Sequence, residues 1–122
     1  MTLALPKSTA QLLKELTGDP RPETALLLIL RDAITHRLER VEAGLRDYEA
    51  KYGMPFEEYK HLWETEDRPE HYSYEAETDY LEWEALVTRK KRLEDLFREL
   101  SERRRKTPLR QVITNPLNPF LF

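Results

Sequence analysis

Two long stretches of this chain contain almost no helix-breaking residue, and this constrains the fold more than any other feature. Between residues 22 and 52 the only glycine is Gly44, and large apolar side chains recur there at three- and four-residue spacing. Residues 73–106 follow the same pattern. Such spacing gathers apolar side chains on one face of a helix, and that face needs a partner to pack against. The sequence therefore predicts two long helices that fold as a hairpin.

Shorter helices are predicted over residues 9–17 and 55–64. Ser8 or Thr9 is a suitable N-cap for the first of these, and Gly18 is a suitable stop because helices often end on a residue with positive φ. The beginning of the 22–52 helix is apolar on more than one face, so we expect it to be buried more deeply than its end.

The two ends of the chain have different patterns. Residues 2–5 alternate small or polar with large apolar side chains before Pro6, which predicts a short strand. A lone strand is not stable, so it would pair with a strand of a second copy or of another protein. Residues 107–122 contain three prolines among apolar side chains, which predicts an extended arm lying in a groove. The predicted fold class is mainly α, with an N-terminal strand, two short helices, two long helices and a C-terminal arm.

The charges are strongly segregated along the chain. Residues 55–86 contain eleven acidic and two basic side chains, whereas residues 87–122 contain four acidic and ten basic ones. Residues 1–54 are balanced, with eight of each sign. Asymmetry of this kind indicates interaction partners rather than a particular fold. A basic partner is expected for the middle of the chain.

Aromatic side chains are interleaved with the carboxylates of this acidic stretch. One interpretation is a docking surface, with aromatic anchors for affinity and carboxylates for steering. The other interpretation is that Tyr80 and Trp83 belong to the core and the carboxylates form a solvated face. On the first interpretation the predicted partner contacts, including two in the arm, are Tyr74, Glu77, Asp79, Tyr80, Glu82, Trp83, Phe120 and Phe122.

Residues that carry catalysis or bind metals are scarce. The chain has no cysteine and no phosphate-binding loop, nucleophile elbow or His-Glu-x-x-His motif. Glu58 and His61 have the Glu-x-x-His spacing of di-iron bundles, but no second copy accompanies them. We therefore expect no enzyme activity, cofactor or metal. The absence of cysteine suits a cytoplasmic protein, and we expect neither a secretory signal nor a membrane span.

A basic run at residues 103–106 ends the second long helix. Cations are favoured at a helix C-terminus by the helix dipole, which is the simplest explanation. The alternatives are a nucleic-acid contact and an internal pairing with the acidic block.

Residues 1–45 resemble a ribbon-helix-helix module in the order strand, short helix, turn at Gly18 and longer helix. In that family two chains pair their strands into a ribbon that lies in the major groove of DNA. The resemblance implies a homodimer bound to operator DNA. The residues that it places near DNA are Thr2, Ala4, Lys7 and Arg21.

Residues 48–86 resemble small prokaryotic antitoxin-like proteins. The similarity lies in Tyr52-Gly-Met-Pro-Phe-Glu-Glu-Tyr59 and in the acidic Glu-Trp stretch from residue 74 to 86. The resemblance implies an antitoxin of a type II pair, which neutralises a basic cognate toxin by direct binding and represses its own promoter. The alternative function is a helical assembly subunit that oligomerises through its N-terminal strand and C-terminal arm, without DNA binding.

These interpretations divide the chain by role. Residues 1–53 are the predicted dimerisation module, residues 54–106 the predicted partner-binding region and residues 107–122 the predicted arm.

Overall fold

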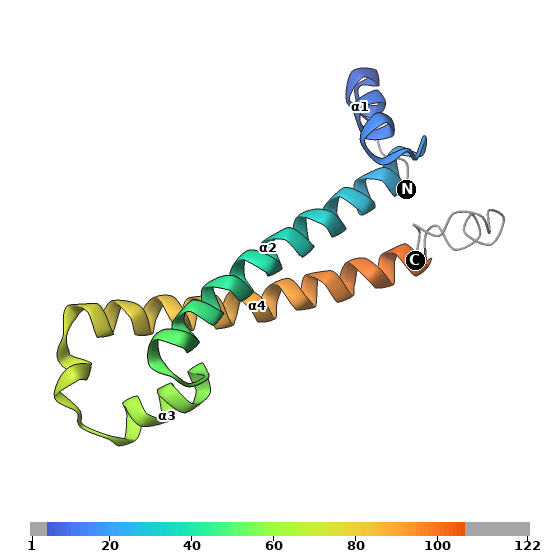
Figure 1. Ribbon diagram of the computed structural model, residues 1–122. Coiled ribbons are helices and arrows are strands. Elements are labelled where there is room, and N and C mark those ends of the chain that lie inside the picture. The colour runs from blue at the N-terminus through green and yellow to red at the C-terminus, as the bar shows by residue number, and fades with distance from the viewer. Residues whose placement is uncertain (1–4, 107–122) are drawn as a thin grey trace. The chain divides into compact units, whose positions relative to one another are not determined.

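The computed structural model describes residues 5–106 of the chain, and side-chain exposure through Arg103. Its elements are helical throughout this range (Figure 1). The predicted helices over 9–17, 22–52, 55–64 and 73–106 are confirmed to within two residues at each end. In order they are α1 (Lys7–Thr17), α2 (Pro22–Tyr52), α3 (Phe56–Thr65), the short 3-10 helix η1 (Pro69–Tyr72) and α4 (Tyr74–Lys106).

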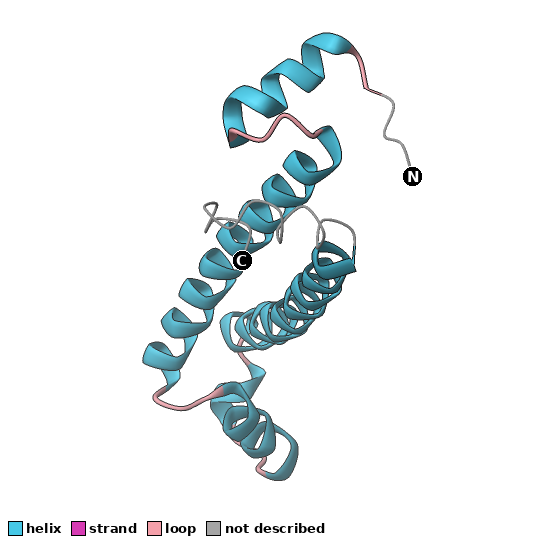
Figure 2. Ribbon diagram, turned by 90° about the vertical axis from the view of Figure 1, so that its right-hand side faces the viewer, coloured by secondary structure: helices cyan, strands magenta, loops and turns pink. Residues whose placement is uncertain are grey.

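The predicted fold class is wrong in its N-terminal strand. Figure 2 shows helices and loops but no strand between residues 5 and 106. Helix α1 begins at Lys7, directly after Pro6, whose φ of −55° suits a helix entry. Four alternating residues are too weak a strand signal to outweigh an adjoining helix. The ribbon that would have paired two copies is therefore not part of the described fold, and residues 1–4 lie outside it.

Two glycines end the first two helices, as the sequence predicts. Gly18 has φ of 78° and Gly53 has φ of 72°, backbone angles that residues with a Cβ rarely adopt. Their backbone N–H groups donate to the carbonyl oxygens of Lys14 and Glu49. The start of α1 was less predictable. Pro6 stands at the N-cap position, so the expected caps at residues 8 and 9 lie inside the helix.

The chain forms two compact units. Of the described residues, we call 36–94 the central unit, and 5–35 together with 95–106 the terminal unit. Helices α2 and α4 contribute to both units. These units are defined by packing. The division into a dimerisation module, a partner-binding region and an arm, with boundaries after residues 53 and 106, stays a prediction.

The described part of the terminal unit leaves several large apolar side chains exposed. Thr24, Ala25 and Leu100 are buried. In contrast, Leu12 and Leu16 of α1 and Leu30 of α2 are exposed. The deep burial expected for the apolar beginning of α2 is therefore not found around Leu30.

The central unit has an aromatic core. The end of α2 and the beginning of α4 are linked there through α3 and η1 (Figure 1). Leu45, Phe56, Tyr59 and Trp83 form the buried cluster, with tyrosines and aliphatic side chains packed around it. Gly44 of α2 lies where α4 comes close, because a Cβ at this position would be 3.0 Å from a methyl group of Leu86. The one glycine inside a predicted long helix thus lies at a close helix contact.

No helix in the described part of the chain is long and apolar enough to cross a membrane.

Candidate functional site

Trp83 is the centre of the central unit. Its side chain has no exposed surface, and the rings of Tyr48, Tyr52 and Tyr59 stack around it with centroids 5.2–5.6 Å away. Phe56 completes the cluster edge-on at 5.2 Å. Stacked and edge-on rings at these separations add to the burial of aromatic area. The Trp83 indole N–H has no hydrogen-bond partner among the described residues.

A polar network beside this cluster joins α2 to α4. The ammonium of Lys51 lies 2.5 Å from Asp79 and 2.7 Å from Glu75, and the Tyr52 hydroxyl donates to Asp79 at 2.5 Å. Burial alone would raise the pKa of Asp79. Hydrogen bonds from Lys51 and Tyr52, together with the Lys51 charge, outweigh burial and lower that pKa. Asp79 is therefore held as a carboxylate facing α2.

A second tyrosine–carboxylate pair lies next to the network. The hydroxyl of Tyr48 donates to Glu82 at 2.5 Å. This hydrogen bond, with burial and the Glu82 charge, raises the pKa of Tyr48 to about 12. The contacts of the network and of this pair connect residues 24 to 34 positions apart, and they hold acidic side chains of α4 against α2.

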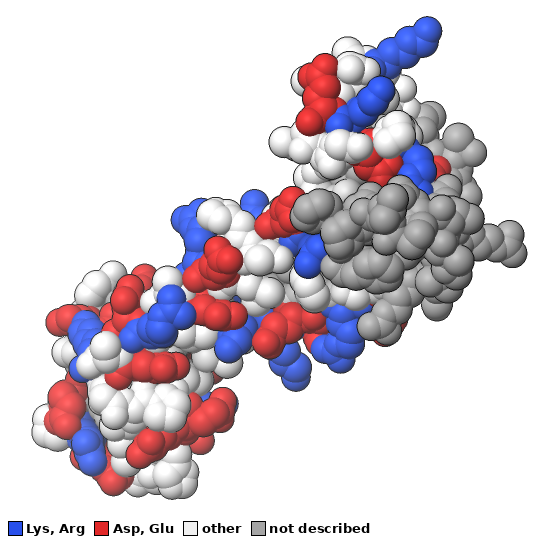
Figure 3. All heavy atoms as spheres, turned by 45° about the vertical axis from the view of Figure 1, so that its right-hand side comes forward, with Lys and Arg blue, Asp and Glu red and all other residues white. Residues whose placement is uncertain are grey.

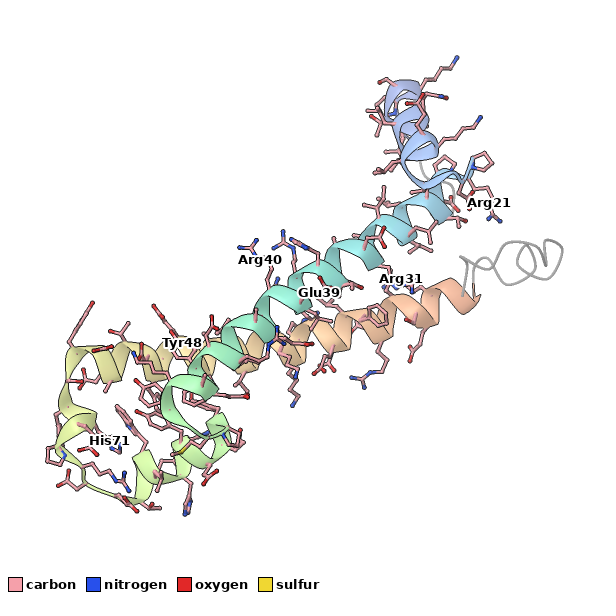
Figure 4. The ribbon with its side chains drawn as sticks, viewed as in Figure 1. Arg21, Arg31, Glu39, Arg40, Tyr48 and His71 are labelled. Carbon is pink, nitrogen blue, oxygen red and sulfur yellow. The ribbon has the colours of Figure 1, made fainter. Side chains whose placement is uncertain are left out.

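An open cleft of about 410 Å³ lies between the end of α3, η1 and the beginning of α4. We call it the acidic cleft, because carboxylates and aromatic rings alternate around it. Within it Trp63 stacks on His71, with ring centroids 4.5 Å apart and planes 20° apart. Figure 4 shows His71 directed inward from η1. The lining residues are Trp63, Glu64, Thr65, Glu66, Asp67, His71, Tyr72 and Glu77.

Hydrogen bonds hold two of the cleft's carboxylates. Tyr72 donates its hydroxyl to Asp67, and Arg68 forms an ion pair with Glu66 at 2.5 Å. Among the side chains of residues 5–103, by contrast, Glu64 and Glu77 have no cation at ion-pair distance. The cleft therefore keeps negative charge that the described fold does not neutralise.

The structure divides the predicted partner contacts into two groups. Trp83 is fully buried, Asp79 is nearly so, and Tyr80 packs on the aromatic core, so these three form part of the fold. A side chain without exposed surface offers no contact to a partner in this conformation. Tyr74 and Glu77 are exposed, and Glu82 is exposed while bonded to Tyr48. The core interpretation of Trp83 is thus confirmed.

Most of the other predicted DNA and partner contacts lie outside the described part of the chain. Thr2, Ala4, Phe120 and Phe122 lie outside the described residues, as does the arm 107–122. Lys7 is exposed at the start of α1.

Arg21 is bound within the fold. Its guanidinium bonds Asp19 at 2.9 Å through Nε and at 2.7 Å through Nη2 (Figure 4). The side-chain hydrogen bond between the two residues raises the pKa of Arg21 and lowers the pKa of Asp19. Arg21 therefore fixes the turn before α2.

The Glu-x-x-His pair and the basic run at residues 103–106 are the two remaining features predicted from the sequence. Glu58 and His61 are both exposed on α3, and no group of three or more metal-ligating side chains gathers within residues 5–106. The basic run ends α4, where the helix dipole favours cations, and Arg103 is exposed.

Sequence reasoning missed the acidic cleft. In the sequence, Trp63 is one apolar side chain of a predicted short helix, and His71 lies in no metal-binding spacing. The sequence does contain a local sign of this cleft. An aromatic-rich helix, the acidic stretch at residues 64–67 and Pro69 follow one another closely. That the turn folds Trp63 onto His71 depends on tertiary packing.

The comparisons with known proteins give a family. The family model described as "Uncharacterized protein MJ0235 family" matches residues 9–105, which span α1 through α4. The chain belongs to the MJ0235 family. No curated protein and no solved structure matches it. The description of the MJ0235 family states no activity or ligand.

Proposed function

We propose that this protein is a non-catalytic binding protein, which recognises a basic partner protein through the acidic surface of its central unit. The observation that carries the proposal is the surplus of carboxylates there. Of the eleven acidic side chains in residues 55–86, four form ion pairs, which leaves seven without a cation among the described residues. Acidic side chains spread over the visible face of this unit in Figure 3.

The arrangement of this surface suits recognition rather than chemistry. Its carboxylates project from helices that pack on the aromatic core, so their backbone positions are set before a partner binds. Tyr72 and Tyr74 are 70% and 85% exposed, and exposed tyrosines are frequent anchors of protein interfaces. Fixed negative charge beside aromatic rings favours a partner rich in arginine and lysine.

The specific form of the proposal is an antitoxin whose basic partner is the cognate toxin of a type II pair. The exposed members of the predicted contact set, Tyr74, Glu77 and Glu82, support it, as does the resemblance of residues 48–86 to antitoxin-like proteins. Operator DNA has less support. The Arg21 guanidinium is occupied by Asp19, and the strand required for a DNA-binding ribbon is not found among residues 5–106.

The test is co-expression with the product of the neighbouring open reading frame. We expect the full chain to restore growth that this product inhibits, and to co-purify with it. Replacing Glu64 and Glu77 by lysine should weaken binding by about tenfold or more at low salt, and by less at high salt, because long-range attraction is screened. Titration calorimetry at two salt concentrations measures the effect.

A matched control separates this surface from total charge. Glu39→Lys with Glu49→Lys changes the net charge equally on exposed positions of α2 in the same unit. This pair should leave the affinity within about twofold of wild type. Absence of both rescue and co-purification would refute the antitoxin proposal.

A second candidate function is an assembly subunit, which the exposed apolar side chains of the terminal unit favour. Leu12 and Leu16 are 65% and 74% exposed on one helix, and Leu16 also borders a groove lined by α2 residues. If a second copy covers this face, Leu12→Ser with Leu16→Ser should halve the mass of the full chain in light scattering. An unchanged mass would argue against assembly through α1.

A further inference from the structure

We infer that the acidic cleft receives an arginine side chain of the partner protein, with the guanidinium between the carboxylates of Glu64 and Glu77 and the ring of Tyr72. The inference rests on the proposed function and names the chemistry that its surface would recognise. Every residue that lines the cleft belongs to the central unit.

His71 is the first reason to regard the cleft as a binding site. It is 8% exposed, and its ring contacts are with Tyr59 and Trp63. Neither imidazole nitrogen has a hydrogen-bond partner among the described residues, and both reach the solvent of the cleft that His71 lines, since Trp83 Nε1 is the one buried unpaired side-chain atom in this part of the chain. The rest of the side chain is buried, so the imidazole presents its nitrogens to whatever enters the cleft. A neutral imidazole offers one acceptor nitrogen for an N–H donor.

The charge of the cleft indicates a cationic partner. Glu64 and Glu77 are exposed carboxylates from different helices, α3 and α4, with no cation at ion-pair distance in the described part of the chain. Arg68 reaches Glu66 instead, at 2.5 Å. A metal ion suits the cleft poorly, because the described residues contain no group of three or more ligands arranged to hold one. An organic cation fits the geometry better.

The aromatic rings distinguish arginine from lysine. A planar guanidinium stacks on an aromatic face while its N–H groups donate in the same plane, which a compact ammonium cannot do. Tyr72 is 70% exposed, and its hydroxyl is tied to Asp67. Its ring is therefore held in place with a face open to solvent. The volume of about 410 Å³ is enough for one such side chain with its neighbouring backbone.

The test uses the full chain labelled with nitrogen-15 and needs no partner protein. Acetyl-Gly-Arg-Gly-amide should shift the indole signal of Trp63 and the imidazole signals of His71, while the indole signal of the buried Trp83 stays in place. The same peptide with neutral citrulline should bind at least about tenfold more weakly, because its hydrogen bonds lack the positive charge.

Variants locate the site. Glu64→Gln and Glu77→Gln should each weaken the arginine peptide severalfold, and His71→Phe should do the same while it keeps a ring against Trp63. Glu57→Gln, an exposed carboxylate of α3 outside the cleft, should have no effect.

Three results would overturn the inference. They are no shift with the arginine peptide, equal binding of the citrulline peptide, and shifts at Trp63 and His71 with magnesium chloride but not with the peptide. The outcome is separable from the proposed function. A chain that rescues growth but ignores arginine would refute the cleft assignment alone, and one that binds arginine without rescuing growth would refute the antitoxin role alone.

Discussion

Replacing Trp83 by alanine should cost about 3–5 kcal/mol of folding free energy, the usual range for removing a large buried aromatic side chain. Trp83 has no exposed surface, and four other rings meet it. Domains are commonly stable by about 5–15 kcal/mol, so the loss is a large fraction of the total. Urea unfolding followed by circular dichroism measures it.

Two further variants keep this prediction testable if the alanine variant does not fold. Trp83→Phe keeps a ring in the cluster and removes the unpaired indole N–H, so it should cost less than half as much as alanine. Leu81→Ala lies on the same helix but at a position 65% exposed, and should change stability by less than about 0.5 kcal/mol. Equal losses at positions 81 and 83 would show that the aromatic cluster is not the stabilising core.

Replacing Asp79 by alanine should cost about 1.5–3 kcal/mol at neutral pH, the range for hydrogen bonds to a charged group. The change removes the acceptor of the Tyr52 hydroxyl and one partner of Lys51. Glu75→Ala is the matched control, since Glu75 pairs with the same ammonium but its side chain is 74% exposed against 12% for Asp79. Exposed pairs contribute about 0–1 kcal/mol, so this control should be nearly neutral.

The effect of Asp79 should depend on pH in a defined direction. Its pKa in the folded chain lies below the ordinary value of 3.8. Its contribution is therefore complete above that value and is lost as the pH falls through the folded pKa. The stability difference between wild type and Asp79→Ala should be constant from pH 7 to pH 5 and should shrink below about pH 4. A difference that persists unchanged at pH 2 would rule out this role of the carboxylate.

Much of the helical framework could be predicted because its causes are local. Three- and four-residue spacing, together with Gly18, Gly53 and the prolines, sets where each helix begins and ends. The N-terminal strand was predicted from four alternating residues, a pattern too short to carry that conclusion. Pro6 and the immediate start of α1 act against it.

The candidate site was only partly predictable. The acidic surplus of residues 55–86 is a property of composition, and the sequence states it directly. Which carboxylates remain free depends on partners far away in the chain. Asp79 is taken by Lys51, 28 positions earlier, whereas Glu77 two residues away is not. The stack of Trp63 on His71 likewise depends on the path of the turn between α3 and η1. Periodicity contains no information about either contact.

Both tryptophans of the chain, Trp63 and Trp83, lie in the central unit. Indole fluorescence therefore reports on that unit and gives no direct signal from residues 5–35 or 95–106. Circular dichroism at 222 nm, by contrast, sums over every helix. If the two units lose structure at different denaturant concentrations, the two optical signals will separate, and the dichroism change outside the fluorescence transition will belong to the terminal unit. The placement of two indoles thus provides an unlabelled measure of how cooperatively the chain unfolds.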